Sequence, residues 1–212
     1  MARVVVADNV FDGRGVSLYR ASDVAITGNT FVAAMKSAKA VVNAENVLER
    51  TVISGNTILR RGVAGPAIGV AHHSGSGPED VLISNNVIRQ ATAGGGIEAL
   101  SPRLVSITGN ALSWSVAAPA AAGIVVRPVI RKAEQVVIEG NRLQASTLLD
   151  GVFLAASPDS FNAVSVVGNL SRGATHGLRC DNPSLFTEAV VHVGNNWETT
   201  PSCSVALVPS AP

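Results

Sequence analysis

The chain has 212 residues, of which 47% are hydrophobic, 4% aromatic and 15% charged, with a formal net charge of +1. This length supports one domain with a sizeable core, and the near-neutral charge without clustered Lys and Arg argues against a nucleic-acid partner. No apolar run is long enough to cross a membrane as a helix, so membrane insertion is not expected. The abundance of Val, Ala, Gly, Ser and Asn favours strands and tight turns over helices.

An apolar segment that runs into an asparagine recurs along the whole chain. In chain order the copies read VVVADNVF (4–11), VAITGNTF (24–31), TVISGNTI (51–58), VLISNNVI (81–88), VSITGNAL (105–112), VVIEGNRL (136–143), VSVVGNLS (164–171) and VVHVGNNW (190–197). Apolar residues alternate with small or polar ones before each asparagine, which indicates a strand with one buried face. The spacing of 20 to 31 residues between copies predicts a solenoid with a fixed unit and variable loops.

The repeated asparagine is predicted to form a ladder. We align it at Asn9, Asn29, Asn56, Asn86, Asn110, Asn141, Asn169 and Asn196. The residue before it reads Asp8, Gly28, Gly55, Asn85, Gly109, Gly140, Gly168 and Asn195. These residue types tolerate positive φ, so each unit is expected to turn through a left-handed conformation there. Buried at this corner, each asparagine would bond to those of the neighbouring coils, because its amide both donates and accepts.

A second strand is predicted between consecutive asparagines. It reads GVSLYR (15–20), AVVNA (40–44), AIGVAH (67–72), GIEALS (96–101), GIVVRP (123–128), GVFLAA (151–156), GLRCDN (177–182) and CSVALV (203–208). Stacking such units pairs each strand with its equivalent one coil on, about 4.8 Å away, and right-handed winding is the default. The predicted fold is an all-β, right-handed, single-stranded parallel β-helix of about eight coils with a buried Asn ladder. We expect one domain over residues 1–212, within a longer protein.

These repeats resemble the right-handed parallel β-helix of the pectate-lyase-like superfamily. The nearest resemblance is to the short I-x-G-N-x-[ILF] repeats of carbohydrate-binding and sugar-hydrolysis modules, and it covers nearly the full length. The resemblance implies that the second strands, such as GIEALS, line a saccharide cleft. It is specific for the fold and says little about activity, since one fold hosts many functions.

On these strands the second and fourth residues should point inward and the third and fifth outward. The outward set is then Ser17, Tyr19, Gly69, Ala71, Glu98, Leu100, Val125, Arg127, Phe153, Ala155, Arg179 and Asp181, with the register of AVVNA ambiguous. One hypothesis is a saccharide site with Glu98 and Asp181 as acid or base. The substrate-binding residues would be Arg127, Arg179, Phe153, Leu100, His72 and Tyr19. The other is a solvated face whose charges pair across strands, for example Glu98 with Arg127.

Several observations argue against specific chemistries. Glu98 and Asp181 would lie three coils apart, roughly 14 Å, whereas a glycosidase pair needs about 5–9.5 Å. Asp150 sits at a strand entrance, and His176 in THGLRC is interpreted as structural. The chain lacks the acidic calcium cluster of pectate lyases, and His72, His73 and Asp80 do not make a convincing metal site. No metal or cofactor is expected.

Cys180 and Cys203 fall on equivalent strands of neighbouring coils. Equivalent positions would be about 4.8 Å apart, within disulfide range. They form either a disulfide, which would suggest export or a virion surface, or two reduced core thiols.

Two function classes follow. The first is a saccharide-recognising module that binds, and in one version cleaves or modifies, an acidic polysaccharide. Arg127 and Arg179 would grip its carboxylates, and as surface residues they should contribute little to stability. The second is a non-catalytic shaft of a phage tail spike or cell-surface protein. Neither end carries a cap, so adjoining domains or subunits, for example in a homotrimer, are expected. An extracellular, cell-surface or virion location is favoured.

Overall fold

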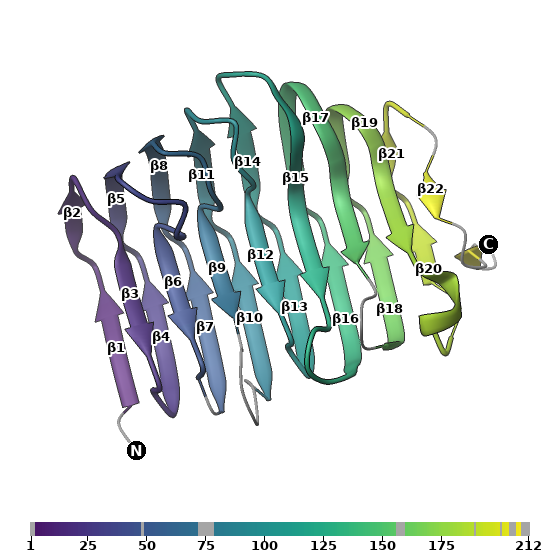
Figure 1. Ribbon diagram of the computed structural model, residues 1–212, viewed down its shortest axis with the longest axis horizontal. Helices are drawn as coiled ribbons and strands as arrows, with labels where there is room; N and C mark the ends of the chain where they lie inside the picture. Colours follow the sequence, from purple (N-terminus) through teal and green to yellow (C-terminus); the bar gives the residue numbers. More distant parts are fainter. Residues whose placement is uncertain are drawn as a thin grey trace.

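A computed structural model describes residues 3–47, 49–71, 79–155, 160–188, 190–199, 201–203 and 207–208. The protein is a parallel β-solenoid with 66% of its residues in strands and no α-helix among those described. Its coils stack along one long axis, with the termini at opposite ends (Figure 1). In the described part, no helix has the length and apolarity needed to cross a membrane.

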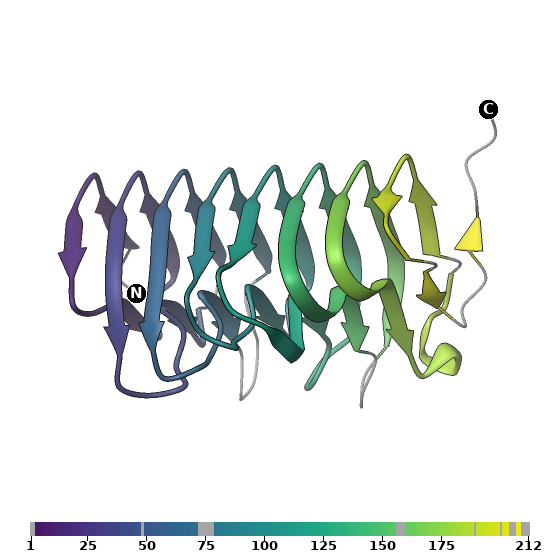
Figure 2. The ribbon, with the colours of Figure 1, turned by 90° about the horizontal axis from the view of Figure 1, so that it is seen from above.

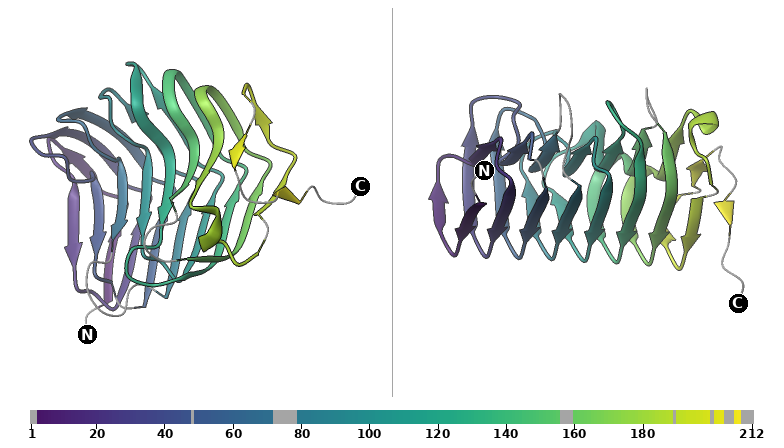
Figure 3. Two further views of the ribbon diagram at one scale, coloured as in Figure 1. Left: turned by 45° about the vertical axis from the view of Figure 1, so that its right-hand side comes forward. Right: turned by 90° about the horizontal axis from the view of Figure 1, so that it is seen from below.

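Each coil contributes strands to three faces of the solenoid. The views from above and below show equivalent strands of successive coils side by side along the long axis (Figures 2 and 3). The first face contains β1 (Arg3–Ala7), β4 (Asp23–Thr27), β7 (Arg50–Ser54), β10 (Asp80–Ser84), β13 (Leu104–Thr108), β16 (Ala133–Glu139), β18 (Phe161–Val167), β20 (Val190–Val193) and β23 (Leu207–Val208). The second face, which follows the asparagine, contains β2 (Val10–Asp12), β5 (Thr30–Met35), β8 (Thr57–Gly62), β11 (Val87–Gln90), β14 (Ala111–Trp114) and β21 (Asn196–Trp197).

The third face is the one predicted to carry the saccharide cleft. It contains β3 (Val16–Tyr19), β6 (Val42–Glu45), β9 (Ile68–Ala71), β12 (Ile97–Leu100) and β22 (Ser202–Cys203). Three long strands turn the corner onto this face, namely β15 (Ala118–Arg127), β17 (Arg142–Ala155) and β19 (Leu170–Asp181). The first halves of β17 and β19 complete the second face. A single 3-10 turn, η1 (Pro183–Leu185), follows β19.

The solenoid has about six turns, fewer than the eight coils predicted. The strands of the end coils are short: β2 has three residues, and β21 and β22 have two each.

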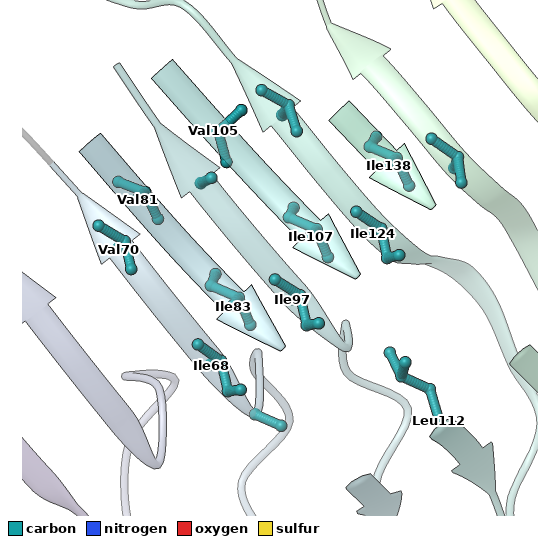
Figure 4. Close-up of a cluster of buried hydrophobic side chains, with 14 of the residues drawn as sticks. Ile68, Val70, Val81, Ile83, Ile97, Val105, Ile107, Leu112, Ile124 and Ile138 are labelled. Carbon is teal, nitrogen blue, oxygen red and sulfur yellow. The ribbon is translucent and has the colours of Figure 1, made fainter. Parts of the chain in front are cut away.

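Inward side chains stack on their equivalents one coil on, which produces continuous apolar rows (Figure 4). Ile68 pairs in register with Ile97, and Ile97 with Ile124. On the first face Ile83 pairs with Ile107 in the same way. All of these side chains are at most 1% exposed. Because each row contains residues of similar size, the side chains of one coil pack closely on those of the next.

The asparagine ladder is confirmed. Asn110 illustrates a rung: its Oδ1 accepts from the backbone N (3.0 Å) and Nδ2 (2.9 Å) of Asn86. Its Nδ2 donates to Oδ1 of Asn141 at 2.9 Å and to the backbone carbonyls of Ile83 and Thr108. The same exchange links every rung from Asn9 to Asn169, so the ladder satisfies backbone groups as well as aligning the coils.

The last rung corrects the predicted alignment. Asn195, not Asn196, accepts from the backbone N (2.8 Å) and Nδ2 (2.9 Å) of Asn169. Asn196 is exposed and pairs in register with Leu170, which also follows a ladder residue. The left-handed residue of this coil is accordingly Gly194, with φ 61°, while the other predicted left-handed positions are confirmed.

Three buried side chains that stack in successive coils, Arg60, Gln90 and Trp114, fix the loops between the second and third faces. Arg60 is 0% exposed and donates to the carbonyls of Ser37, Lys39, Val63 and Pro66. Burial lowers the pKa of its guanidinium. Gln90 and Trp114 follow in register on the next coils. Gln90 Nε2 donates to the carbonyls of Gly65 and Gly95, and Trp114 Nε1 donates to that of Gly94, so each side chain reaches the loop of the preceding coil. This corner is therefore fixed by side chains that satisfy backbone acceptors.

Cys180 and Cys203 form a disulfide between neighbouring coils, with Cα atoms 4.5 Å apart. It ties β22 to β19.

Replacing both cysteines by Ala should lower the free energy of unfolding by about 3 kcal/mol, because the bond closes a loop across 23 residues and restricts the unfolded chain. Denaturant unfolding of the oxidised protein, the reduced protein and the double variant measures the loss. Equal midpoints for all three would show that the disulfide does not stabilise the last coil.

Candidate functional site

The outward side of the third face carries two rows of side chains in register. The first row contains Ser17, Asn43, Gly69, Glu98, Val125, Phe153 and Arg179. The second contains Tyr19, Glu45, Ala71, Leu100, Arg127, Ala155 and Asp181. The alternation predicted for these strands is confirmed, although the outward Gly69, Ala71, Phe153 and Ala155 are buried. Strand β6 places Asn43 of the ambiguous AVVNA segment, and Glu45 just beyond it, on this face.

The half of this face nearer the N-terminus is acidic. Glu45 and Glu98 line one hollow above the small residues Gly69 and Ala71. The Glu45 carboxylate accepts a hydrogen bond from Asn43 Nδ2 at 2.9 Å. A second hollow lies on the other side of Glu98, over Ala122 and its neighbours. Lys39 also lines the first hollow, whereas Glu98 is the only charged residue that lines the second.

The half nearer the C-terminus is organised by Asp150, which is 1% exposed. Its Oδ1 accepts from Nε of Arg179 at 2.9 Å and lies 3.0 Å from Nδ1 of His176. Asp150 stands directly opposite His176 in the register of β17 and β19. A buried carboxylate thus orients two cationic or donor groups at the edge of the third face.

Arg179 is held on two further sides. Its guanidinium lies over the ring of Phe153, 3.7 Å from the centroid, and its Nη1 is 3.8 Å from Oδ1 of Asp181. The side chain is still 28% exposed. Because Asp150 binds Nε, this carboxylate does not use the two terminal nitrogens of the guanidinium.

His176 is the second exposed group of this cluster, with 32% of its side chain accessible. A carboxylate can only accept, so the contact with Asp150 places a proton on Nδ1. In the neutral ring Nε2 is then an acceptor. The other carboxylate oxygen of Asp150, Oδ2, is buried and has no hydrogen-bond partner among the described residues.

The structure does not bring the two predicted catalytic carboxylates together. Glu98 and Arg179 stand three coils apart in one row, and Asp181 lies two residues beyond Arg179. Asp181 instead accompanies Arg179. No ion pair joins Glu98 to Arg127, although both residues are described, so the predicted cross-strand pairing is not present.

The predicted binding residues have different surroundings. Arg127 and Leu100 are partly exposed neighbours in register. Tyr19 is 57% exposed but lies on the first coil, beside Arg20. Phe153 is only 9% exposed because Arg179 covers its ring, so it does not offer the open sugar-stacking surface that was predicted. His72 and His73 lie outside the described residues.

Sequence reasoning missed the roles of Glu45, Asp150 and His176. Asp150 and His176 were both noted, but each was assigned to a strand entrance without a partner. A signal was present: DGVF and HGLR place a polar residue before the same corner glycine in consecutive coils. Aligning that position would have put the two side chains about 4.8 Å apart.

Among the described residues, no group of three or more His, Cys, Asp or Glu side chains could hold a metal ion. The cluster around Asp150 can therefore be described with this chain's own side chains, as a positioned guanidinium beside an oriented imidazole. A search of family models, of curated proteins and of solved structures found no match to this chain.

Proposed function

We propose that this protein binds an acidic polysaccharide along the third face, at its C-terminal half. The observation that carries the proposal is the fixing of Arg179 by buried Asp150 and by the ring of Phe153. An arginine held in this way loses little conformational entropy when it binds a carboxylate, and it presents a planar fork of matching geometry.

Arg127 supports the same ligand. It is partly exposed, and within the described residues the structure records no ion pair for it. Arg127 lies in the second outward row, one coil after Leu100. Asp181 lies in the same row, two coils after Arg127. Consecutive coils repeat at about 4.8 Å, close to the roughly 5 Å length of one sugar residue in an extended chain. Because Arg127 and Arg179 are two coils apart, a uronate polymer could meet them from two sugars separated by one other sugar.

The charge distribution sets the limits of the site. Glu98, which lines the second hollow without a cation beside it, would repel a carboxylated chain, so we place the end of the chain near Glu98. The imidazole of His176 would accept a hydrogen bond from a sugar hydroxyl through Nε2. The disulfide supports a location outside the reducing cytosol, where such polymers occur.

The test is binding of polygalacturonate by the variant Arg127→Ala/Arg179→Lys, compared with neutral dextran. Arg179→Lys keeps the charge but removes the fork, and unlike Ala it does not strip a cation from buried Asp150. We expect at least a tenfold loss of polygalacturonate affinity, with wild-type binding weakened by added salt. Product analysis of the same mixtures shows whether a bound chain is also cleaved.

Arg50→Ala is a matched control, because it removes an exposed arginine from the first face. It should leave binding unchanged. Equal affinity of the wild type and the Arg127/Arg179 variant would place the site elsewhere. Absence of binding to any polysaccharide by the wild type would favour the non-catalytic shaft.

A further inference from the structure

The second face carries a groove that the proposed saccharide site does not use. Three arginines line it, Arg89 on β11, Arg142 on β17 and Arg172 on β19. Its floor includes the polar side chains of Ser113 and Gln144. The groove therefore combines positive charge with hydrogen-bonding groups on a face that is separated from the third face by a corner of the solenoid.

The register fixes the spacing of the three arginines. Arg89 pairs with Ser113, Ser113 with Gln144, and Gln144 with Arg172, so Arg89 and Arg172 are three coils apart in one row, roughly 14 Å. Arg142 lies on the same strand as Gln144, two residues before it, and so belongs to the neighbouring row of outward side chains. The Cα atom of Arg142 is about 8 Å from that of Arg172 and about 12 Å from that of Arg89.

The positive charge of this groove is poorly compensated. Arg89 and Arg142 form no ion pair in the described part of the chain. Arg172 approaches Glu198 at only 3.9 Å, and both side chains are more than half exposed, so this pair is weak. Among the outward residues of the short strands β2, β5, β8, β11 and β14, only Asp12 on the first coil is a carboxylate.

We infer that this arginine groove is a second binding site, for a linear glycan that carries a carboxylate on every second sugar. At roughly 5 Å per sugar, such carboxylates recur about every 10 Å, which lies between the 8 and 12 Å spacings of the arginines. Ser113 and Gln144 lie between the arginines, where the hydroxyls of the intervening neutral sugar would be.

Other polyanions fit less well. Bases of single-stranded nucleic acid stack on aromatic rings, but Trp114 and Trp197 on this face pack into the core. A polyphosphate concentrates its charge far more densely than three arginines over about 14 Å can match. With sites on two faces, one molecule could bind two glycan chains and so link them. This goes beyond the proposed function, and it does not depend on it.

The test uses a hyaluronan octasaccharide, which alternates one uronate with one neutral sugar. Binding is measured by calorimetry in the Arg127→Ala/Arg179→Lys background, so that any remaining affinity belongs outside the third face. Adding Arg89→Gln, Arg142→Gln and Arg172→Gln should weaken this remaining binding at least tenfold. The control adds Arg3→Gln, Arg14→Gln and Arg50→Gln, which remove the same charge elsewhere and should leave it unchanged.

Equal affinities of the two five-site variants would overturn the proposal, as would an absence of binding before the groove is altered. Tighter binding of polyphosphate, dextran sulfate or single-stranded DNA than of the octasaccharide at this groove would overturn the ligand class. None of these results depends on polygalacturonate binding at the third face, so the two sites can fail separately.

Discussion

Replacement of Asn110 by Ala is expected to lower the free energy of unfolding by about 3 kcal/mol, more than most single substitutions. The side chain is 1% exposed and lies in the middle of the ladder. Its loss removes the side-chain acceptor of the Asn86 backbone N and one of the two acceptors of Asn86 Nδ2, which keeps the carbonyl of Ile53, and it removes the bond that Asn110 donates to the carbonyl of Ile83. Each buried group left unpaired costs about 1–3 kcal/mol, reduced here by relaxation and water entry. Denaturant unfolding gives the difference directly.

Two other asparagines are matched controls. Asn9→Ala removes the exposed first rung, whose side chain donates only to Ala7 and Asn29, and should cost well under 1 kcal/mol. Asn196→Ala should have almost no effect, because Asn195 occupies the ladder in that coil. A loss for Asn9→Ala equal to that for Asn110→Ala would contradict a ladder stabilised by burial.

The fold was predictable because every repeat contains the same two structural signals. Alternation of apolar and polar residues with a period of two determines which side chains face the core, and a left-handed residue before each asparagine determines where the chain turns. The error at the last rung arose where VGNN offers two asparagines. Gly194 decides between them, since it is equivalent to Gly168, and both have positive φ.

The candidate site was predictable only where the strands are regular. Glu98, Arg127 and Asp181 follow from alternation over the last residues of their strands, and the structure places them as expected. Asp150 lies on a strand whose register shifts between Gln144 and Leu148, so alternation cannot be extended through it. Its partners come from the next coil, and pairing between coils depends on loop lengths that the repeat does not fix.

The two halves of the third face also make a directional surface. Carboxylates dominate near Glu45 and Glu98, whereas Arg127, Arg179 and His176 lie toward the C-terminal end. Under the proposed function, Arg127 and Arg179 would attract an acidic chain and Glu98 would repel it. Asp150 and Asp181 beside Arg179, and Lys39 beside Glu45, reduce this contrast between the two halves.

Replacement of Asp150 should have the largest effect on the proposed saccharide site. In Asp150→Ala, Arg179 and His176 lose the carboxylate that orients them. We expect a loss of about 2 kcal/mol in the free energy of unfolding. This is less than the 3–5 kcal/mol for a fully buried pair, because both partners are partly exposed. Polygalacturonate affinity should fall about tenfold, since the guanidinium of Arg179 must then be ordered on binding.

Asp150→Asn separates orientation from charge. The amide oxygen can still accept from Arg179 and His176, while the negative charge beside the ligand is removed. Affinity for the acidic chain should therefore equal or exceed that of the wild type, although the amide nitrogen takes the place of an unpartnered oxygen and costs some stability. If charge alone mattered, Ala would strengthen binding as much as Asn does. The expected order of affinity, Asn at or above wild type and wild type above Ala, requires that Asp150 acts by holding Arg179 in place.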